Sequence, residues 1–153
     1  MRDPYVVRPA RLSDLDRVTE LILELQDHLE QANPGLWRMK PEAREGLRAQ
    51  VANRLNAAGS MAVVAEHRDE GVVGVAFGRV VANHRYESAL SGNLDQVYVR
   101  PDHRRRGIAS RLVAEVCRFF AREGVTDLSL RYVIGNDEAA GQWVPAPKDL
   151  TLQ

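Results

Sequence analysis

The chain has 153 residues, of which 44% are hydrophobic and 27% charged, a composition typical of one globular domain, here expected over residues 1–153. Lysine plus arginine and aspartate plus glutamate both number 21, so the net charge is zero and the chain lacks the overall basic charge that drives general binding to nucleic acids or anionic membranes. Cys117 is the single cysteine, which excludes an intramolecular disulfide, and without a signal-peptide pattern or a membrane-length apolar run we expect a cytoplasmic protein.

The first segments are predicted to form a short strand and a long helix. Residues 5–8 are aromatic and β-branched and stop at Pro9. From Ser13, a preferred residue type for a helix N-cap, apolar residues recur at helical spacing to about residue 30. We therefore expect a helix over residues 13–30 whose polar side, which includes Glu24, faces solvent.

A loop and a second helix follow. The loop contains Trp37 and Met39, which either line a ligand pocket or cover the core beneath them. Pro41 suits the first turn of a helix, and Gly59 suits its end. The second helix is therefore predicted between these two residues.

Three strands are then predicted to form an antiparallel meander. Residues 61–67 and 72–81 are rich in β-branched residues and are separated by a turn, which is typical of a hairpin. Gly74 and Gly78 interrupt the second strand, which suggests bulges or the close approach of another segment. A polar loop leads into the third strand, residues 94–99.

A long amphipathic helix and a fifth strand complete the predicted core. Apolar residues recur every four positions from Ile108 onward, and Gly124 suits the position after the helix. Residues 127–133 alternate as a strand does. Because a helix connects the strands 94–99 and 127–133, these two strands should be parallel. Asn136 is then expected to cap a short helix.

The junction between strand 94–99 and the long helix is the strongest functional signal in the chain. The first turn of a helix presents backbone N–H groups without intrahelical partners at the positive end of the helix dipole, and an anion fits there. Gly107 would let a phosphate approach the backbone closely. The basic residues before it are Arg104, Arg105 and Arg106. Their forked donors suit phosphate oxygens, so a diphosphate is the expected ligand, although any one arginine could equally belong to a solvated turn.

Residues 97–101 and 104–109 together resemble the acetyl-CoA-binding motif of the GCN5-related N-acetyltransferases. Arg104, Gly107 and Ala109 match the fixed positions of the family pattern Gln/Arg-x-x-Gly-x-Gly/Ala. The predicted order of elements, over about residues 5–143, resembles that of the family as well. The resemblance implies an α/β (α+β) fold with a mixed, mostly antiparallel central sheet, flanked by helices, in which a parallel strand pair parts to form the acetyl-CoA cleft.

The resemblance also implies which residues hold acetyl-CoA, the acetyl donor. Amides of the loop would bind the pyrophosphate, and the preceding strand would offer backbone groups to the pantetheine arm. Asn136 stands where the family often has an asparagine that contacts the coenzyme. The implied coenzyme-binding residues are Val97, Tyr98, Val99, Arg104, Arg105, Arg106, Gly107, Ile108, Ala109, Ser110 and Asn136. We expect no metal site.

The C-terminal end departs from the family pattern. Trp143 stands where a tyrosine often protonates the departing thiolate, and an indole cannot supply a proton at neutral pH. The prolines that follow disfavour a regular strand, so the two further strands usual in the family should be short or missing. An incomplete sheet exposes an edge that a second copy could cover, so a homodimer is a hypothesis.

In an N-acetyltransferase of this family, a primary amine would lose a proton and attack the thioester directly. Asp95, on the strand facing the cleft, is the first candidate for the general base, although it could equally be a surface residue, and Glu87 is a weaker candidate. Tyr132 on the neighbouring strand could replace the missing acid. A backbone N–H of Tyr98 or Val99 would stabilise the oxyanion. The expected acceptor is a small molecule or an amino acid.

Two other functions stay open. A non-catalytic protein that binds or senses acyl-CoA on the same fold would suit the altered C-terminal end. Nucleic-acid binding through residues 100–106 fits less well, because no aromatic residues are interleaved and the net charge is zero. The expected partners are therefore acetyl-CoA and a small amine, without nucleic acid or membrane.

Overall fold

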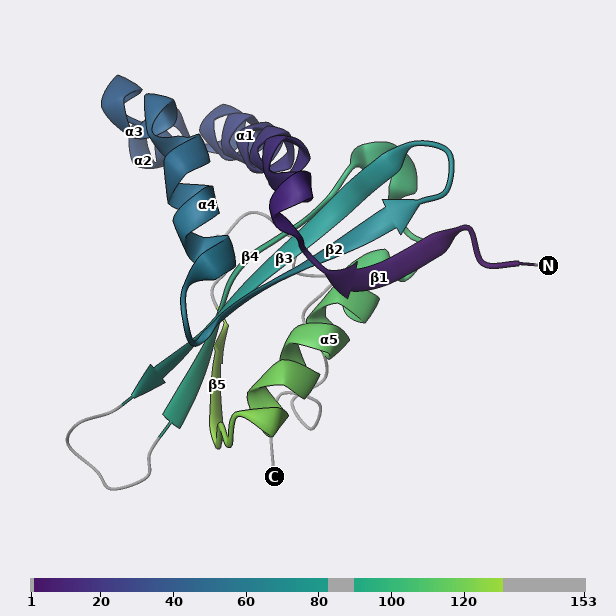
Figure 1. Cartoon of the computed structure of the whole chain (residues 1–153). Helices are drawn as coiled ribbons and strands as arrows, with labels where there is room; N and C mark the ends of the chain where they lie inside the picture. Colours follow the sequence, from purple (N-terminus) through teal and green to yellow (C-terminus); the bar gives the residue numbers. More distant parts are fainter. Residues whose placement is uncertain (1, 83–89, 131–153) are drawn as a thin grey trace.

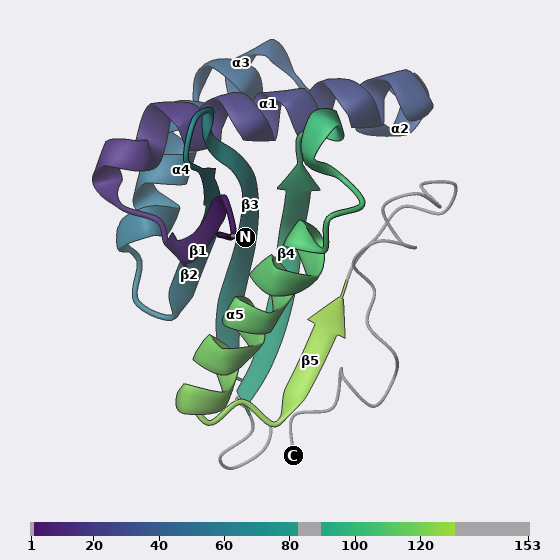
Figure 2. The ribbon, with the colours of Figure 1, turned by 90° about the vertical axis from the view of Figure 1, so that its right-hand side faces the viewer.

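The computed structural model describes residues 2–82 and 90–130, in which five strands form one sheet in the order β1-β2-β3-β4-β5. Helices α1 to α4 lie on one face of this sheet and α5 lies on the other (Figures 1 and 2). Among the predicted residues, Glu87, Tyr132, Asn136 and Trp143 lie outside the described part of the chain, as do the expected short or missing C-terminal strands.

The elements have the following bounds: β1 Tyr5–Pro9, α1 Leu15–Ala32, α2 Pro34–Trp37, α3 Pro41–Glu45, α4 Leu47–Asn56, β2 Ser60–His67, β3 Gly71–Ala82, β4 Leu90–Val99, α5 Ile108–Arg122 and β5 Asp127–Leu130. Two 3-10 turns, η1 (Leu12–Asp14) and η2 (Pro101–His103), precede α1 and α5. None of the helices in the described ranges is both long enough and apolar enough to cross a bilayer.

The start of α1 differs from the prediction, because Ser13 lies inside η1 and not at the N-cap. Asp14 organises this turn instead. Its carboxylate accepts the Arg11 N–H at 2.7 Å and two guanidinium hydrogen bonds from Arg8, at 2.8 and 3.0 Å. The hydrogen bonds from Arg8 hold the pKa of Asp14 below its usual range. The turn is therefore fixed to β1 by an ion pair, which helical periodicity does not reveal.

The predicted second helix is two helices, and the loop before it contains a helical turn. Gly46 separates α3 from α4, in keeping with the low helix propensity of glycine. Asn33 caps α2 by accepting the Leu36 N–H at 3.3 Å. Met39 N–H donates to Glu30 at 2.8 Å. Segment 33–39 is thus tied to α1, and neither predicted role of the apolar residues in it is decided by these contacts.

The meander of β2, β3 and β4 is confirmed, and so is the parallel pairing of β4 with β5. Strand β4 begins at Leu90, four residues before the predicted start. Its register with β3 shifts between Phe77, which pairs with Gln96, and Gly78, which pairs with Leu94. Asp95 is therefore the extra residue of a β-bulge in β4, and such bulges re-aim side chains.

Helix α5 approaches the sheet closely at two glycines. A Cβ at Gly78 would lie 2.5 Å from Val116 Cγ1, and a Cβ at Gly92 would lie 2.7 Å from the ring of Phe120. The predicted close approach at Gly78 is thus confirmed, with α5 as the approaching segment. Cys117 packs partly buried against the same apolar cluster, and burial raises the pKa of its thiol. These contacts fix the position of α5, and with it the N-terminus of this helix.

Candidate functional site

Among the described residues, the pairing of β4 with β5 covers the first half of β4. The register runs from Ser91 opposite Asp127 to Leu94 opposite Leu130. Within residues 2–82 and 90–130, no strand pairs with residues 95–99 on that side, whereas β3 pairs with them on the other. The second half of β4 thus has an open edge in the described part of the molecule, at the end where α5 begins (Figure 2).

The backbone groups on this open edge follow from the hydrogen bonds to β3. Arg100 N–H donates to Val73 O at 2.9 Å, so the backbone N–H and C=O groups of Arg100 point toward β3. The backbone N–H and C=O groups of successive residues in a strand point alternately toward the two neighbouring positions in the sheet. The backbone groups of Tyr98 therefore also face β3, while those of Val97 and Val99 face the open edge. The hydrogen bond of 3.0 Å from Arg104 Nε to Val99 O agrees with this direction. Of the two predicted oxyanion donors, only the Val99 N–H faces the edge.

The loop after β4 has two residues in the left-handed region, Arg105 with φ 62° and Gly107 with φ 75°. Gly107 is the N-cap of α5, and the first intrahelical bond runs from Arg111 N–H to Gly107 O at 3.1 Å. The backbone N–H groups of the first turn of α5, before Arg111, therefore have no acceptor within the helix and point toward the loop. Nothing lies within 4 Å of a Cβ built on Gly107, so the space in front of this turn is open.

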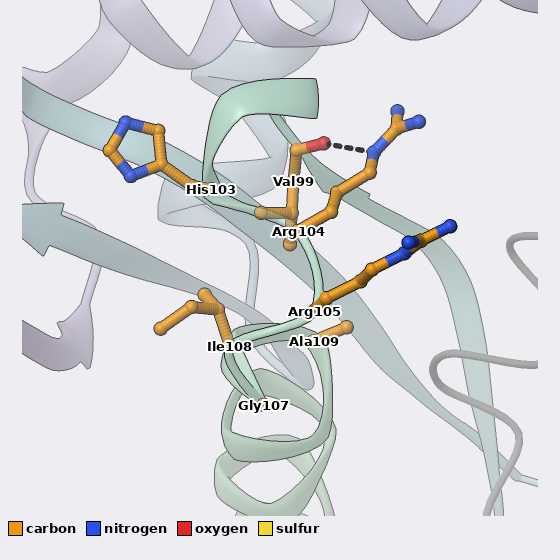
Figure 3. Close-up of a pocket in the computed structure, with 7 residues that line it drawn as sticks. All are labelled: Val99, His103, Arg104, Arg105, Gly107, Ile108 and Ala109. Carbon is orange, nitrogen blue, oxygen red and sulfur yellow. Dashed lines mark hydrogen bonds between the residues drawn. The ribbon is translucent and has the colours of Figure 1, made fainter.

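A pocket of about 310 Å³ lies at this junction, and it is lined by Val99, His103, Arg104, Arg105, Gly107, Ile108 and Ala109. Figure 3 shows Arg104 and Arg105 extending to the same side of the loop, while the ring of His103 points the other way. Two guanidinium groups and a helix N-terminus thus meet at one cavity. This combination attracts a polyanion such as a diphosphate.

The predicted coenzyme-binding residues differ in whether their side chains are available to a ligand. Ile108 and Ala109 are buried in the core, so only their backbone can serve the pocket. Val97 is buried in the same way, and Ser110 is exposed on the first turn of α5. Arg106 does not line the pocket, because its guanidinium donates to Tyr5 Oη at 2.9 Å. The third arginine therefore fastens the loop to β1.

The Asp95 side chain lies on the face of the sheet that carries α4, opposite to the face that carries α5. Its Oδ2 accepts from Arg54 at 2.7 Å, and both side chains are about one-quarter exposed, at 24%. The guanidinium of Arg54 also lies 4.4 Å from the ring centroid of Phe77. Burial lowers the pKa of Arg54, while Asp95 opposes this shift. The predicted base is thus a carboxylate paired with a partly buried cation, and it is not among the residues that line the pocket.

Sequence reasoning missed the role of Glu24. Its side chain is about one-third exposed, at 34%, and its carboxylate accepts hydrogen bonds from Tyr98 Oη at 3.1 Å and from Arg100 Nη2 at 2.7 Å, so the expected solvated position is only partly correct. Burial, with Glu24 adding to it, raises the pKa of Tyr98 to about 12. The partners are 74 and 76 residues apart in the chain, so no local pattern could have identified the contact.

Solved structures with the same fold include acetyltransferases. A GCN5-related N-acetyltransferase from Ralstonia eutropha is 21% identical, with a TM-score of 0.69 and coverage of 94% of each chain. An acetyltransferase from Vibrio fischeri is 23% identical, with a TM-score of 0.67 over 82% of this chain and 93% of the other. AAC(6′)-Iy, crystallised with a bisubstrate analogue of CoA, is 20% identical, with a TM-score of 0.66 over 91% and 86%.

These likenesses confirm the predicted fold class. A search of curated proteins finds no match. The sequence model of the acetyltransferase (GNAT) family matches residues 22–142, which include β4, the arginine–glycine loop and α5. The chain therefore belongs to the GNAT family of acetyltransferases.

Proposed function

We propose that the protein transfers an acetyl group from acetyl-CoA to the primary amine of a small molecule or an amino acid. The observation that carries the proposal is the pocket in which the open edge of β4 meets the N-terminus of α5. Membership of the acetyltransferase family supports it. Among the structural relatives, the aminoglycoside N-acetyltransferase AAC(6′)-Iy was crystallised with CoA, which makes a small amine a reasonable acceptor here.

The coenzyme would lie across the pocket with its diphosphate at the helix. N–H groups of the turn after Gly107 are oriented toward this position, and Arg104 and Arg105 add donors beside it. The pantetheine arm carries amides, which need backbone partners in extended geometry. Val97 and Val99 offer such groups on the open edge of β4. Asn136, outside the described residues, stays a proposed further contact.

The reaction would be a direct attack of the amine on the thioester carbonyl. The amine first gives up a proton, and its nitrogen forms the new C–N bond while the carbonyl oxygen becomes an oxyanion. The C–S bond breaks when this tetrahedral intermediate collapses, and the CoA thiolate leaves. The Val99 N–H, which faces the open edge of β4, would stabilise the oxyanion of the tetrahedral intermediate. Asp95 is our candidate for the base that takes the amine proton, and Arg54 would hold its carboxylate in position. Glu87 as an alternative base and Tyr132 as the acid remain proposals on residues outside the described part.

A second candidate function is supported by the same ion pair. A carboxylate that is already engaged by Arg54 at 2.7 Å is a less available proton acceptor, which suits a protein that binds acyl-CoA without turning it over. The two functions share the coenzyme pocket and differ in chemistry. Release of free CoA thiol across a panel of primary amines would establish the transferase, and saturable acetyl-CoA binding without any release would establish the binding protein.

Calorimetric titration with acetyl-CoA tests the site itself. Gly107→Glu places a carboxylate in the open space at the diphosphate position, so we expect the affinity to fall at least about 100-fold. Gly124→Glu is the matched control. Gly124 has φ 79° at the other end of α5 and likewise has nothing within 4 Å of a Cβ, so backbone strain and added charge are the same. Equal affinity of the two variants would contradict the proposed site.

A homodimer and a cytoplasmic location are further proposals. The open edge of β4 is the feature that a second copy could cover, by adding a strand or by packing across it. The chain has a mass of 17.1 kDa, so light scattering distinguishes a monomer from a dimer directly. A monomeric mass at micromolar protein would contradict the dimer.

A further inference from the structure

Two histidines and a glutamate meet behind the arginine–glycine loop. His67 ends β2, Glu70 lies in the turn between β2 and β3, and His103 ends η2, directly before Arg104. One nitrogen of each histidine and one carboxylate oxygen of Glu70 all lie within 4.8 Å of one another. His103 also lines the proposed diphosphate pocket, but its ring points away from Arg104 and Arg105 in Figure 3, toward a different side of the loop.

His103 presents an unsatisfied nitrogen to this cluster. The side chain is only 3% exposed, and its Nε2 is a buried atom that forms no hydrogen bond within the described residues. Glu70 Oε2 lies 3.1 Å from this Nε2, close enough for charge pairing but without hydrogen-bond geometry. A buried polar nitrogen without a partner is unfavourable, so a ligand that supplies one would be stabilising.

The other ring nitrogen of His103 is already engaged. Its Nδ1 lies 2.6 Å from Tyr5 Oη, which also accepts a hydrogen bond from Arg106. If Nδ1–H donates to Tyr5 Oη, Nε2 carries a lone pair and faces the cluster as an acceptor. Histidines that bind a metal through one nitrogen typically donate the other N–H to such an oxygen, which fixes the orientation of the ring.

His67 is held in the form that can coordinate a metal. Its Nδ1 accepts the backbone N–H groups of Asp69 and Glu70, at 3.2 and 3.3 Å, which requires an unprotonated nitrogen. Both hydrogen bonds are long, so a cation could replace them. The same Nδ1 lies 3.8 Å from Glu70 Oε2. Because the Glu70 side chain is 55% exposed, its carboxylate can move to close that gap.

We propose that His67, Glu70 and His103 bind a divalent transition-metal ion such as Zn²⁺. Two imidazoles and one carboxylate are a donor set that Zn²⁺ takes in proteins, with water in the fourth position. The 3.1 Å between His103 Nε2 and Glu70 Oε2 suits two atoms that share one ion at about 2.1 Å each. The ion would link the β2–β3 turn to the segment that precedes the coenzyme loop. Because this proposal concerns binding alone, it does not depend on the proposed acetyl transfer.

The test is a calorimetric titration of tag-free, chelator-treated protein with Zn²⁺, together with the visible spectrum after addition of Co²⁺. We expect one equivalent to bind per chain, with the absorption of a tetrahedral Co²⁺ site that has nitrogen and oxygen ligands. The absence of thiolate charge-transfer absorption distinguishes this site from Cys117. Glu70→Gln and His67→Gln should each weaken binding at least about tenfold, because each removes a ligand.

Two matched variants control for charge and for histidine content. Asp69→Asn removes the neighbouring exposed carboxylate, and His28→Gln removes a histidine on α1, so both should bind Zn²⁺ as the wild type does. At one fixed concentration, Zn²⁺ should raise the Tm of the wild type and of Asp69→Asn by more than that of Glu70→Gln. Glu70 is exposed, so its variant should fold and keep the test informative even if His67→Gln does not. No saturable binding by the wild type, or equal binding by Glu70→Gln, would overturn the proposal.

Discussion

The two faces of the sheet are built from different kinds of contact. On the face that carries α5, the core is a cluster of mainly hydrophobic side chains, and Gly78 and Gly92 let the helix approach the strands. On the face that carries α1 and α4, an apolar cluster is accompanied by two ion pairs. Glu24 of α1 pairs with Arg100, the residue after β4, and Arg54 of α4 pairs with Asp95 of β4.

This difference suggests that the α5 face fixes the position of the coenzyme site, while the α1/α4 face supplies charged groups that could take part in the reaction. Close packing leaves α5 little freedom, so its N-terminus stays where the loop and the open edge of β4 can share one ligand. Charged groups that are only partly buried keep polar atoms near β4 on the opposite face. We therefore expect the larger loss of stability from substitutions on the α5 face, and the loss of turnover from substitution of Asp95 on the α1/α4 face.

The largest effect is expected at Asp95. Asp95→Asn keeps the size of the side chain but removes the proposed base, so turnover should fall by about 100-fold or more, while acetyl-CoA affinity stays the same. Steady-state rates over a range of pH, with calorimetry for binding, separate the two quantities. Asp16→Asn, which alters an exposed ion pair with Arg48, is the control. Unchanged turnover and an unchanged pH profile in Asp95→Asn would remove the base assignment.

The next effect tests the packing of α5. In Gly92→Ala the new Cβ would lie 2.7 Å from the ring of Phe120, so either the ring or the helix must shift. We expect the free energy of unfolding to fall by about 2 kcal/mol in denaturant titrations. Gly35→Ala is the control, because the nearest atom would be at an ordinary 3.7 Å. Equal stability of the two variants would mean that the α5 face is less tightly packed than the distances imply.

A smaller effect is expected at Glu24. Glu24→Gln removes the charge paired with Arg100 but retains an acceptor for Tyr98 Oη, so the loss of stability should be about 1 kcal/mol. Glu20→Gln, on the same helix, alters an exposed pair with Arg17 and should change stability by less than about 0.5 kcal/mol. Thermal unfolding compares the two variants, and indistinguishable Tm values would contradict a structural role for Glu24.

The smallest effect is a pH dependence on the alkaline side. The pKa of Tyr98 is raised in the folded protein from 10.0 to about 12, so the fold favours the neutral phenol. This contribution to stability is present in full below pH 10 and is lost as the pH rises from 10 through about 12. Tyr98→Phe should therefore lose less stability than the wild type over that interval in urea titrations. Parallel losses in both proteins would exclude Tyr98 as the group responsible.

The local parts of the fold could be predicted because their signals are local. Helical periodicity located α1 and α5, and β-branched runs located β2 and β3. The errors fall where side chains reach outside their own segment. The N-cap of α1 is Asp14 and not the predicted Ser13, and the carboxylate of Asp14 is bound by Arg8 on β1. The early start of β4 at Leu90 reflects its pairing with β3, which a polar composition did not indicate.

In the candidate site, too, the local features could be predicted from the sequence and the long-range contacts could not. The sequence of the loop from Arg104 to Ala109 was enough to predict an anion-binding helix N-terminus, because glycine conformation and helix capping depend on a few neighbouring residues. Tertiary structure alone decided that Arg106 fastens to Tyr5, that Arg54 holds Asp95, and that Val99 rather than Tyr98 faces the open edge. It also brought His67 and His103 together. Contacts between residues tens of positions apart depend on strand register and helix packing, which no local pattern in the chain encodes.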